Sequence, residues 1–302
     1  MKEKRIIVNA DDFGMSKGIT DAVLVAHRYG FLTSTSLMVN LNCAEYALAQ
    51  VARAPRLGVG VHLNICEGRP VLPASEVRSL VDPHGNFHRP PVMIQKLWRW
   101  EVAGKEMEAE FRAQISWMKQ RGLHPTHADS HHHTHIYPAA LGPFVRAMKA
   151  EGIERVRASR FSCWPNSHRN RDYKGSMIRW LAARMYRTIL QATLLAGIES
   201  PDSRLSFPAG DDCNRNYVRE RWMQAFVHLG PGTYELACHP GLFDPDFSPT
   251  DRIRPQREAE LQCLTDPALR AVLEQNEIQL ISYGALGRRD VMRASAEKAI
   301  AS

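Results

Sequence analysis

The sequence predicts a single α/β domain folded as one irregular, TIM-like (β/α) barrel. Strand and helix patterns alternate along most of the 302 residues, and about seven or eight strands follow one another in one continuous series. Such alternation implies parallel strands joined by right-handed crossovers. Residues 160–232 break the rhythm with many aromatic and arginine side chains, so we expect an insertion or lid there.

The first elements follow from short apolar runs and capping signals. Residues 5–9 are apolar and rich in β-branched side chains, which predicts a buried strand. Ser16 is placed to cap the following helix, and Gly30 is expected at the C′ position after it. The next expected elements are strand 34–40, helix 43–53, strand 59–64 and a loop rich in proline and glycine, 67–91.

The remaining elements continue the same alternation. Residues 105–121 are a strong helix pattern, because Met107, Phe111, Ile115 and Met118 recur on one face. The elements expected after it are a strand ending at 127–130, helix 138–150, and strands 153–158, 233–238 and 278–282.

Composition and charge narrow the class of protein. Hydrophobic content of 44% and charged content of 24% are ordinary for a soluble globular protein. The net charge of +7 indicates a mild preference for anionic partners, but we find no nucleic-acid-binding motif. Six scattered cysteines without a C-x-x-C pair indicate reduced thiols of a cytoplasmic protein. Neither a signal peptide nor a transmembrane span is expected.

Two polar clusters stand at predicted strand ends. Asp11 and Asp12 follow the first strand, in the loop before the first helix. Adjacent residues on an extended backbone point in different directions, so one carboxylate can bind a metal while the other faces a substrate. The alternative is that one caps the helix and the other is solvated. With the histidines described next, they suggest a divalent metal with a base beside it, which is the equipment of a hydrolase.

The second cluster is the histidine-rich segment 127–135. An extended backbone would place His127, Asp129, His131, His133 and His135 on one side. One or two of these would ligate a metal, and the others would orient ligands or contact substrate. A solvated polar loop is the alternative.

Two single histidines complete the candidate set. His62 lies near the end of an alternating strand, where a packed core histidine is the common alternative. His239 follows a strand and precedes Pro240 and Gly241, so it projects into a loop-lined region or is an ordinary turn residue. Both fall at carboxyl ends of strands, the face where barrel enzymes build their sites.

Four motifs in this order resemble the YdjC-like (ChbG-type) carbohydrate deacetylases: NADDFG at 9–14, GVHLN at 60–64, THADSHHHTH at 126–135 and CHPG at 238–241. The resemblance is close over 1–160 and looser over 233–284. It implies one domain over 1–302, a barrel related to polysaccharide deacetylases, and removal of acetyl groups from N-acetylated sugars with one divalent metal, Mg²⁺ or Zn²⁺.

The resemblance also implies roles for individual residues. Asp12, His62 and His131 would hold the metal, Asp11 would be the catalytic base, and His239 the general acid. We expect the neighbouring motif residues Phe13, His127, Asp129 and His133 to contact substrate. A subgroup linked to hopanoid biosynthesis shares this layout, so the N-acetylglucosamine unit would belong to a chito-oligosaccharide or to a glycolipid.

Other interpretations remain open at this point. The chain could hydrolyse another ester or a phosphoester, or be a non-catalytic sugar-binding barrel. Residues 176–198 form a basic amphipathic pattern, which indicates either a helix packed on the barrel or peripheral contact with an anionic membrane. A homodimer is left open, since barrels of this size often pair but no interface stripe stands out.

Overall fold

The computed structural model describes residues 3–157, 161–162, 198–205, 207, 213–244 and 254–287. Its strands are β1 (Lys4–Phe13), β2 (Ser34–Leu37), β3 (Gly58–Leu63), β4 (Ala128–Ser130), β5 (Phe161–Ser162), β6 (Ser203–Leu205), β7 (Gly232–Cys238) and β8 (Ile278–Leu280). Its helices are α1 (Lys17–Tyr29), α2 (Ala44–Val51), α3 (Pro90–Trp98), α4 (Gly104–Gln120), α5 (Pro138–Ala150), α7 (Arg215–Val227), α8 (Arg254–Leu264) and α9 (Pro267–Gln275). Short 3₁₀ helices are η1 (Ala74–Glu76), η2 (His131–Ile136) and η3 (Tyr283–Ala285).

The strands form one curled parallel sheet with β1 at its centre. The order is β4-β3-β2-β1-β7-β6-β5, and β8 pairs with the first residues of β1. Single parallel bridges join Ala128 of β4 to Val156, and Arg155 to Glu199 just before β6, so the sheet curls back on itself. The predicted irregular α/β barrel is therefore confirmed, and its longest uninterrupted pairing joins β1 to β7.

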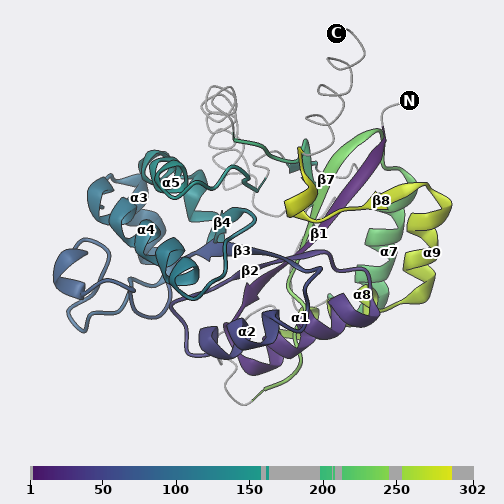
Figure 1. Cartoon of the computed structure of the whole chain (residues 1–302), viewed down its shortest axis with the longest axis horizontal. Helices are drawn as coiled ribbons and strands as arrows, with labels where there is room; N and C mark the ends of the chain where they lie inside the picture. The colour runs from purple at the N-terminus through teal and green to yellow at the C-terminus, as the bar shows by residue number, and fades with distance from the viewer. Residues whose placement is uncertain are drawn as a thin grey trace, which may run out of the picture.

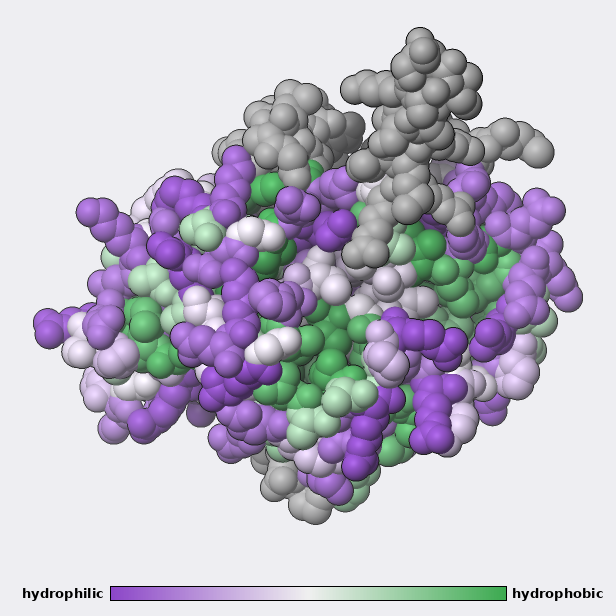
Figure 2. Space-filling view, viewed as in Figure 1, coloured by the Kyte–Doolittle hydropathy of each residue, from purple (hydrophilic) through white to green (hydrophobic). Residues whose placement is uncertain are grey.

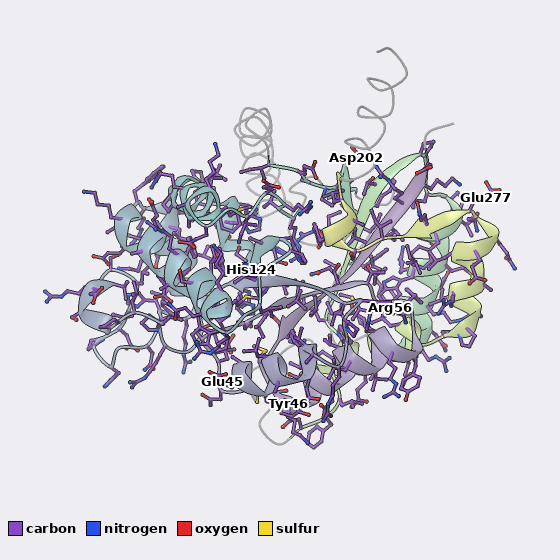
Figure 3. All side chains as sticks on the ribbon, viewed as in Figure 1. Glu45, Tyr46, Arg56, His124, Asp202 and Glu277 are labelled. Atoms are coloured by element: carbon purple, nitrogen blue, oxygen red, sulfur yellow. The ribbon has the colours of Figure 1, made fainter. Side chains whose placement is uncertain are left out.

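Helices cover the outside of this sheet in three groups. In Figure 1, α3, α4 and α5 gather beside the β3–β4 edge, α1 and α2 lie beneath β1 and β2, and α7 and α9 flank β7 and β8. Tyr46 of α2, labelled in Figure 3, donates its hydroxyl to Asp21 of α1 at 2.6 Å, which ties neighbouring helices together. Hydrophilic side chains dominate the rim of this face, and hydrophobic ones gather nearer its centre (Figure 2).

Alternation along β1 separates the helix-packed core from the barrel interior. Ile6 and Val8 belong to the large hydrophobic core that the helices share. Ile7 packs instead with Tyr283 in a small second cluster. Since alternate strand residues point to opposite faces, Asp11 shares the interior face of Ile7, two pairs of residues further along the strand. The interior face of β1 thus carries an apolar side chain near the strand's start and a carboxylate near its end.

Capping of α1 follows the sequence prediction at its start but not at its end. The Ser16 side chain accepts a hydrogen bond from the backbone N–H of Ile19, as expected of an N-cap. Gly30 ends the helix, but its φ of −121° is not the left-handed conformation of a C′ glycine. A Cβ there would lie 2.2 Å from the carbonyl oxygen of Leu264, so close backbone approach requires the glycine.

Several further local expectations differ from the structure. The predicted strand 153–158 is reduced to the bridges at Arg155 and Val156, and the predicted loop 67–91 contains η1. The extended path predicted through 127–135 is wrong beyond Ser130, because His132 and His133 adopt φ of 51° and 53° and turn the chain into η2.

The described part of the expected insertion contributes barrel elements. Residues 203–205 form β6, which pairs with β7, and residues 215–227 form α7. Residues 163–197, 206 and 208–212 lie outside the described residues, and so does nearly all of the basic amphipathic segment 176–198. Among the residues that the structure describes, none of the helices combines the length and apolarity needed to cross a bilayer.

Candidate metal centre and active site

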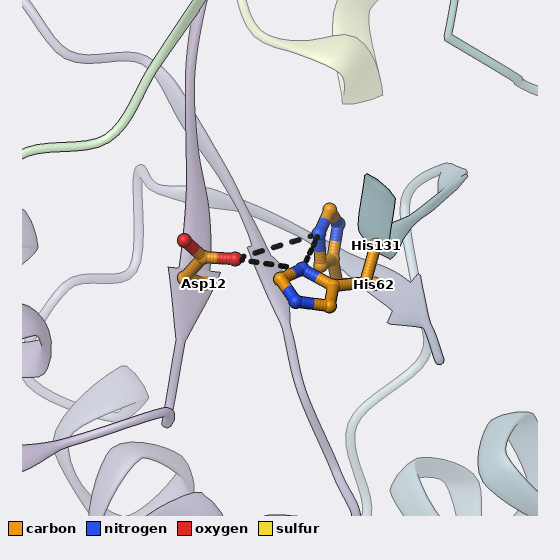
Figure 4. Close-up of side chains that lie close together, drawn as sticks. All are labelled: Asp12, His62 and His131. Carbon is orange, nitrogen blue, oxygen red and sulfur yellow. Dashed lines mark hydrogen bonds and ion pairs between the residues drawn. The ribbon is translucent and has the colours of Figure 1, made fainter. Parts of the chain in front are cut away.

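Three side chains converge at the carboxyl ends of β1, β3 and β4 (Figure 4). Asp12 Oδ1 lies 3.6 Å from His62 Nε2 and 3.2 Å from His131 Nδ1. The two imidazole nitrogens lie 3.4 Å from each other. All three residues are buried. The sequence-predicted metal ligands are therefore brought together in one place.

A local backbone distortion brings Asp12 to this place. Asp11 and Asp12 are residues of β1 itself and not of the loop after it, which corrects the sequence expectation. A regular strand would turn their side chains to opposite faces. Asp12 instead has φ of 63°, and the pairing of β1 with β2 shifts register between Ala10 and Phe13. This left-handed conformation costs about 1–2 kcal/mol, and it places both adjacent carboxylates at the same site.

His62 is oriented by a fully buried carboxylate. Its Nδ1 lies 2.7 Å from Asp129 Oδ1, and Ser36 donates its hydroxyl to the other oxygen of Asp129 at 3.0 Å. Arg157 pairs with the same carboxylate at 2.8 Å. Because a carboxylate only accepts hydrogen bonds, His62 donates from Nδ1 and turns Nε2 toward Asp12, so Nε2 is the nitrogen available to a metal.

His131 is oriented in the opposite sense. Its Nε2 lies 3.0 Å from Glu67 Oε2 and donates its N–H there, while Nδ1 faces Asp12. Burial lowers the pKa of His131, but its hydrogen bonds to Asp12 and Glu67 outweigh burial and raise that pKa to about 9. The two histidines thus offer different ring nitrogens to one point.

The donor set at this point fits a metal cation. One nitrogen of each imidazole and one carboxylate oxygen face each other, and the other nitrogen of each imidazole donates its N–H to a second carboxylate. Ligands held about 2.1 Å from a tetrahedral zinc lie about 3.4 Å apart, which matches the separations of 3.2, 3.4 and 3.6 Å. Three protein ligands also leave positions open, as a catalytic metal site requires.

The second oxygen of Asp12 is held by a cation from a distant part of the chain. Arg257 of α8 donates to Asp12 Oδ2 at 2.7 Å. Burial favours a raised pKa for Asp12, but Arg257 and His131 outweigh it and hold the pKa well below its usual range. Asp12 is therefore ionised and fixed in orientation, and its Oδ1 is left facing His62 and His131, where a metal would bind.

Asp11 lies beside the metal point in a separate ion cluster. Arg157 grips both carboxylate oxygens of Asp11, at 2.7 Å for Oδ2, and also pairs with Glu235 at 2.9 Å. Burial favours a raised pKa for Asp11, yet Arg157 outweighs it and lowers that pKa. His239 Nε2 lies 3.7 Å from Asp11 Oδ2, and its side chain is 30% exposed. Asp11 and His239, the two residues for which the resemblance implied base and acid roles, thus lie side by side in the structure.

The four residues expected to contact substrate have other surroundings. Phe13, His127 and Asp129 have no exposed surface. His127 stacks on Tyr283 with ring centroids 3.7 Å apart, and burial lowers its pKa to about 3. His133 is half-buried and accepts from Arg204 at 3.0 Å. Three of these side chains therefore pack or orient other groups, and direct contact with a ligand would require the interior to open.

Sequence reasoning missed four charged residues of the site. Arg157, Glu235 and Arg257 complete the ion pairs of the two aspartates, and Glu67 orients His131. The available signal was weak, because each lies outside the densest part of a motif. Glu235 and Arg157 sit inside predicted strands, where a charged residue among apolar neighbours indicates a buried ion pair.

Comparison with known proteins agrees with this geometry. The family described as YdjC-like protein matches residues 5–275. A carbohydrate deacetylase from Geobacillus stearothermophilus is 33% identical over 278 residues, covering 92% of this chain and 96% of the relative. A chitooligosaccharide deacetylase from Yersinia enterocolitica is 32% identical, covering 93% of this chain and 98% of the relative.

A solved structure supports the same relationship. A candidate cellobiose-phosphate cleavage protein from Enterococcus faecalis V583 superimposes with a TM-score of 0.74 at 25% identity, covering 94% of this chain and 98% of that chain. The family match spans most of the chain, including all four sequence motifs and every residue of the candidate centre. On these grounds the chain belongs to the YdjC-like family.

Proposed function

We propose that this protein is a metal-dependent hydrolase that removes the N-acetyl group from an N-acetylglucosamine-containing carbohydrate. The observation that carries the proposal is the convergence of Asp12 Oδ1, His62 Nε2 and His131 Nδ1 within 3.6 Å of one another. The pair Asp11–His239 lies alongside, at 3.7 Å. The names of the relatives, carbohydrate and chitooligosaccharide deacetylases, support the same reaction.

The three converging residues would hold one divalent metal ion. Once bound, the ion would supply Lewis acidity, which polarises an acetamide carbonyl and acidifies a water molecule. Two imidazoles and one carboxylate suit zinc, while a carboxylate with open positions for water also suits magnesium. We therefore propose Zn²⁺ or Mg²⁺ as the ion.

Asp11 and His239 would carry the proton transfers. Asp11 would accept the proton of the attacking water as general base, with Arg157 keeping its carboxylate ionised and fixed in direction. His239, partly exposed, would donate a proton to the departing sugar nitrogen. An amine is a poor leaving group unless it is protonated, so an acid is needed beside the base. Buried Asp129 would orient His62 and Arg157.

The substrate would be a chito-oligosaccharide or a glycolipid that carries N-acetylglucosamine. The chitooligosaccharide relative favours the first. The cysteines that the structure describes, Cys43, Cys66, Cys213, Cys238 and Cys263, are free thiols. Free thiols are typical of a reducing compartment, which supports a cytoplasmic site of action.

Acetate release tests the proposal directly. The metal-reconstituted protein is offered N,N′-diacetylchitobiose and an N-acetylglucosaminyl lipid, and free acetate is measured over time. We expect release that Asp11→Asn reduces by about 10²–10⁴-fold while metal stays bound, and that Asp12→Asn abolishes together with metal binding. A metal-loaded wild-type protein that releases no acetate from either substrate would contradict the proposal.

A further inference from the structure

The two histidines of the metal centre present different ring nitrogens, and each choice is set by a different carboxylate. His62 offers Nε2 because Asp129 engages its Nδ1. His131 offers Nδ1, the nitrogen nearer its own backbone, because Glu67 engages its Nε2. We propose that Glu67 is the positioning residue that fixes His131 in its metal-binding tautomer and orientation. This inference rests on the metal dependence in the proposed function.

The need for such a residue follows from the chemistry of imidazole. A neutral histidine carries its proton on either nitrogen, and only the unprotonated nitrogen binds a metal. An N–H on Nδ1 of His131 would point at Asp12 Oδ1, 3.2 Å away, and occupy the metal point. In the neutral ring, the Glu67 carboxylate, 3.0 Å from Nε2, holds the N–H on the opposite side, away from Asp12.

Glu67 is held in place by its backbone, which leaves its side chain to serve His131. Its carbonyl oxygen accepts hydrogen bonds from Asn64 Nδ2 at 2.7 Å and from Asn40 Nδ2 at 2.9 Å. Its N–H donates to Asn64 Oδ1 at 3.1 Å. The next residue, Gly68, has φ of +73°, which lets the chain turn away at once. The loop therefore does not depend on the Glu67 carboxylate for its shape.

The hydrogen bonds that hold the Glu67 backbone continue through Asn64 into the core. Asn64 is fully buried and exchanges backbone hydrogen bonds with the Gln114 side chain of α4, at 2.9 and 2.6 Å. Gln114 is in turn held by Glu110, one helical turn earlier, at 2.8 Å. Glu67 thus stands at the end of a chain of satisfied hydrogen bonds anchored on α4. Such an arrangement is expected where one carboxylate must keep a fixed position.

A different role for Glu67 is distinguishable. Glu67, His131 and His132 also bring ligand atoms within 4.8 Å of one another. If Glu67 and His131 Nε2 bound a second ion there, the protein would bind two metals per chain. We favour the positioning role because the direct contact of 3.0 Å between Glu67 and His131 Nε2 is that of a hydrogen bond.

Metal affinity, measured apart from activity, tests the inference. Zinc binding is measured by chelator competition, and the cobalt(II) protein is followed by its visible absorption. We expect Glu67→Ala to weaken binding by about 10–100-fold and to change the cobalt spectrum. Glu67→Gln keeps an acceptor without the charge, so its loss should be smaller. The matched control is Glu76→Gln, which removes an exposed carboxylate on η1 of the same segment and should change neither quantity.

A second variant separates position from charge. Asn40→Ala removes an anchor of the Glu67 carbonyl and leaves the carboxylate present, so metal affinity should fall, but less than in Glu67→Ala. Thermal unfolding confirms that each variant is folded. Unchanged affinity and spectrum in folded Glu67→Ala would overturn the inference alone, and so would two metals per wild-type chain. A wild-type protein that binds no metal would overturn both this inference and the proposed function.

Discussion

Each of the two histidines of the candidate centre is oriented by a carboxylate, but the two carboxylates lie in different surroundings. We call each histidine, with its carboxylate and the partners of that carboxylate, an arm of the centre. The His62 arm runs through Asp129 to Arg157 and Glu235, all of them without exposed surface. The His131 arm ends at once in Glu67, whose side chain is 34% exposed. The His62 arm is therefore part of the barrel core, whereas the His131 arm ends in a partly exposed loop residue beside the site. The difference implies that only the first arm also determines whether the barrel folds.

The physical reason lies in the dielectric environment. Buried charges interact strongly, and removing one partner leaves the other uncompensated. In water-exposed positions the same pair contributes little to stability. Changes in the His62 arm should therefore affect both stability and metal binding. Changes in the His131 arm should affect metal binding alone.

The largest effect is expected at Arg157. Arg157→Met would leave Asp11, Asp129 and Glu235 as buried carboxylates without their shared cation. We expect a loss of about 3–5 kcal/mol in the free energy of unfolding, measured by urea denaturation with metal removed by chelator. Arg155→Met is the control: Arg155 is partly exposed and 3.8 Å from Glu199, so it should cost about 1 kcal/mol. Equal losses of unfolding free energy in the two variants would contradict the contrast between buried and exposed ion pairs.

Asp129→Asn compared with Glu67→Gln tests the contrast between the arms themselves. Both changes replace a carboxylate that receives an imidazole N–H, so both should weaken metal binding, Asp129→Asn by about 10–100-fold. Only Asp129→Asn weakens a buried ion pair with Arg157, so it should also destabilise the fold by about 1–3 kcal/mol. Glu67→Gln should stay within about 0.5 kcal/mol. Similar destabilisation of both variants in urea would show that the arms do not differ.

The smallest effect is expected at Ser36, which supports the buried arm. Ser36→Ala removes the hydroxyl that donates to Asp129 at 3.0 Å and leaves the Arg157 and His62 contacts of that carboxylate in place. The expected cost is about 1 kcal/mol in unfolding free energy, with a small decrease in metal affinity by chelator competition. A decrease as large as that of Asp129→Asn would place Ser36, and not Asp129, in control of His62.

Several parts of the site were predictable because they are local in sequence. Asp12, His62 and His131 lie at or directly after the carboxyl ends of strands that the sequence identifies, and parallel strands place these ends at one edge. The path through the histidine segment was not predictable in the same way. Alternation holds only while the backbone stays extended, and His132 and His133 leave it with positive φ.

Other parts depended on contacts between distant residues. Arg157 meets Asp11 across 146 positions of the chain, and Arg257 meets Asp12 across 245. Neither pair has a spacing that a periodic pattern reveals. Glu67 was overlooked for a related reason, since a single acid in a loop rich in proline and glycine reads as solvated until its position beside His131 is known.

The sequence by itself determined the parallel α/β barrel and the strand-end positions of the candidate ligands, because these follow from periodicity and strand order, and its four motifs supplied the resemblance that implied roles for Asp11 and His239. The tertiary structure decided which nitrogen each histidine presents, which cation holds each aspartate, and that Phe13, His127 and Asp129 are interior residues. The physical reason is that tautomers, ion pairs and burial depend on which atoms lie within a few ångströms. That proximity is created only when segments distant in the chain are packed together.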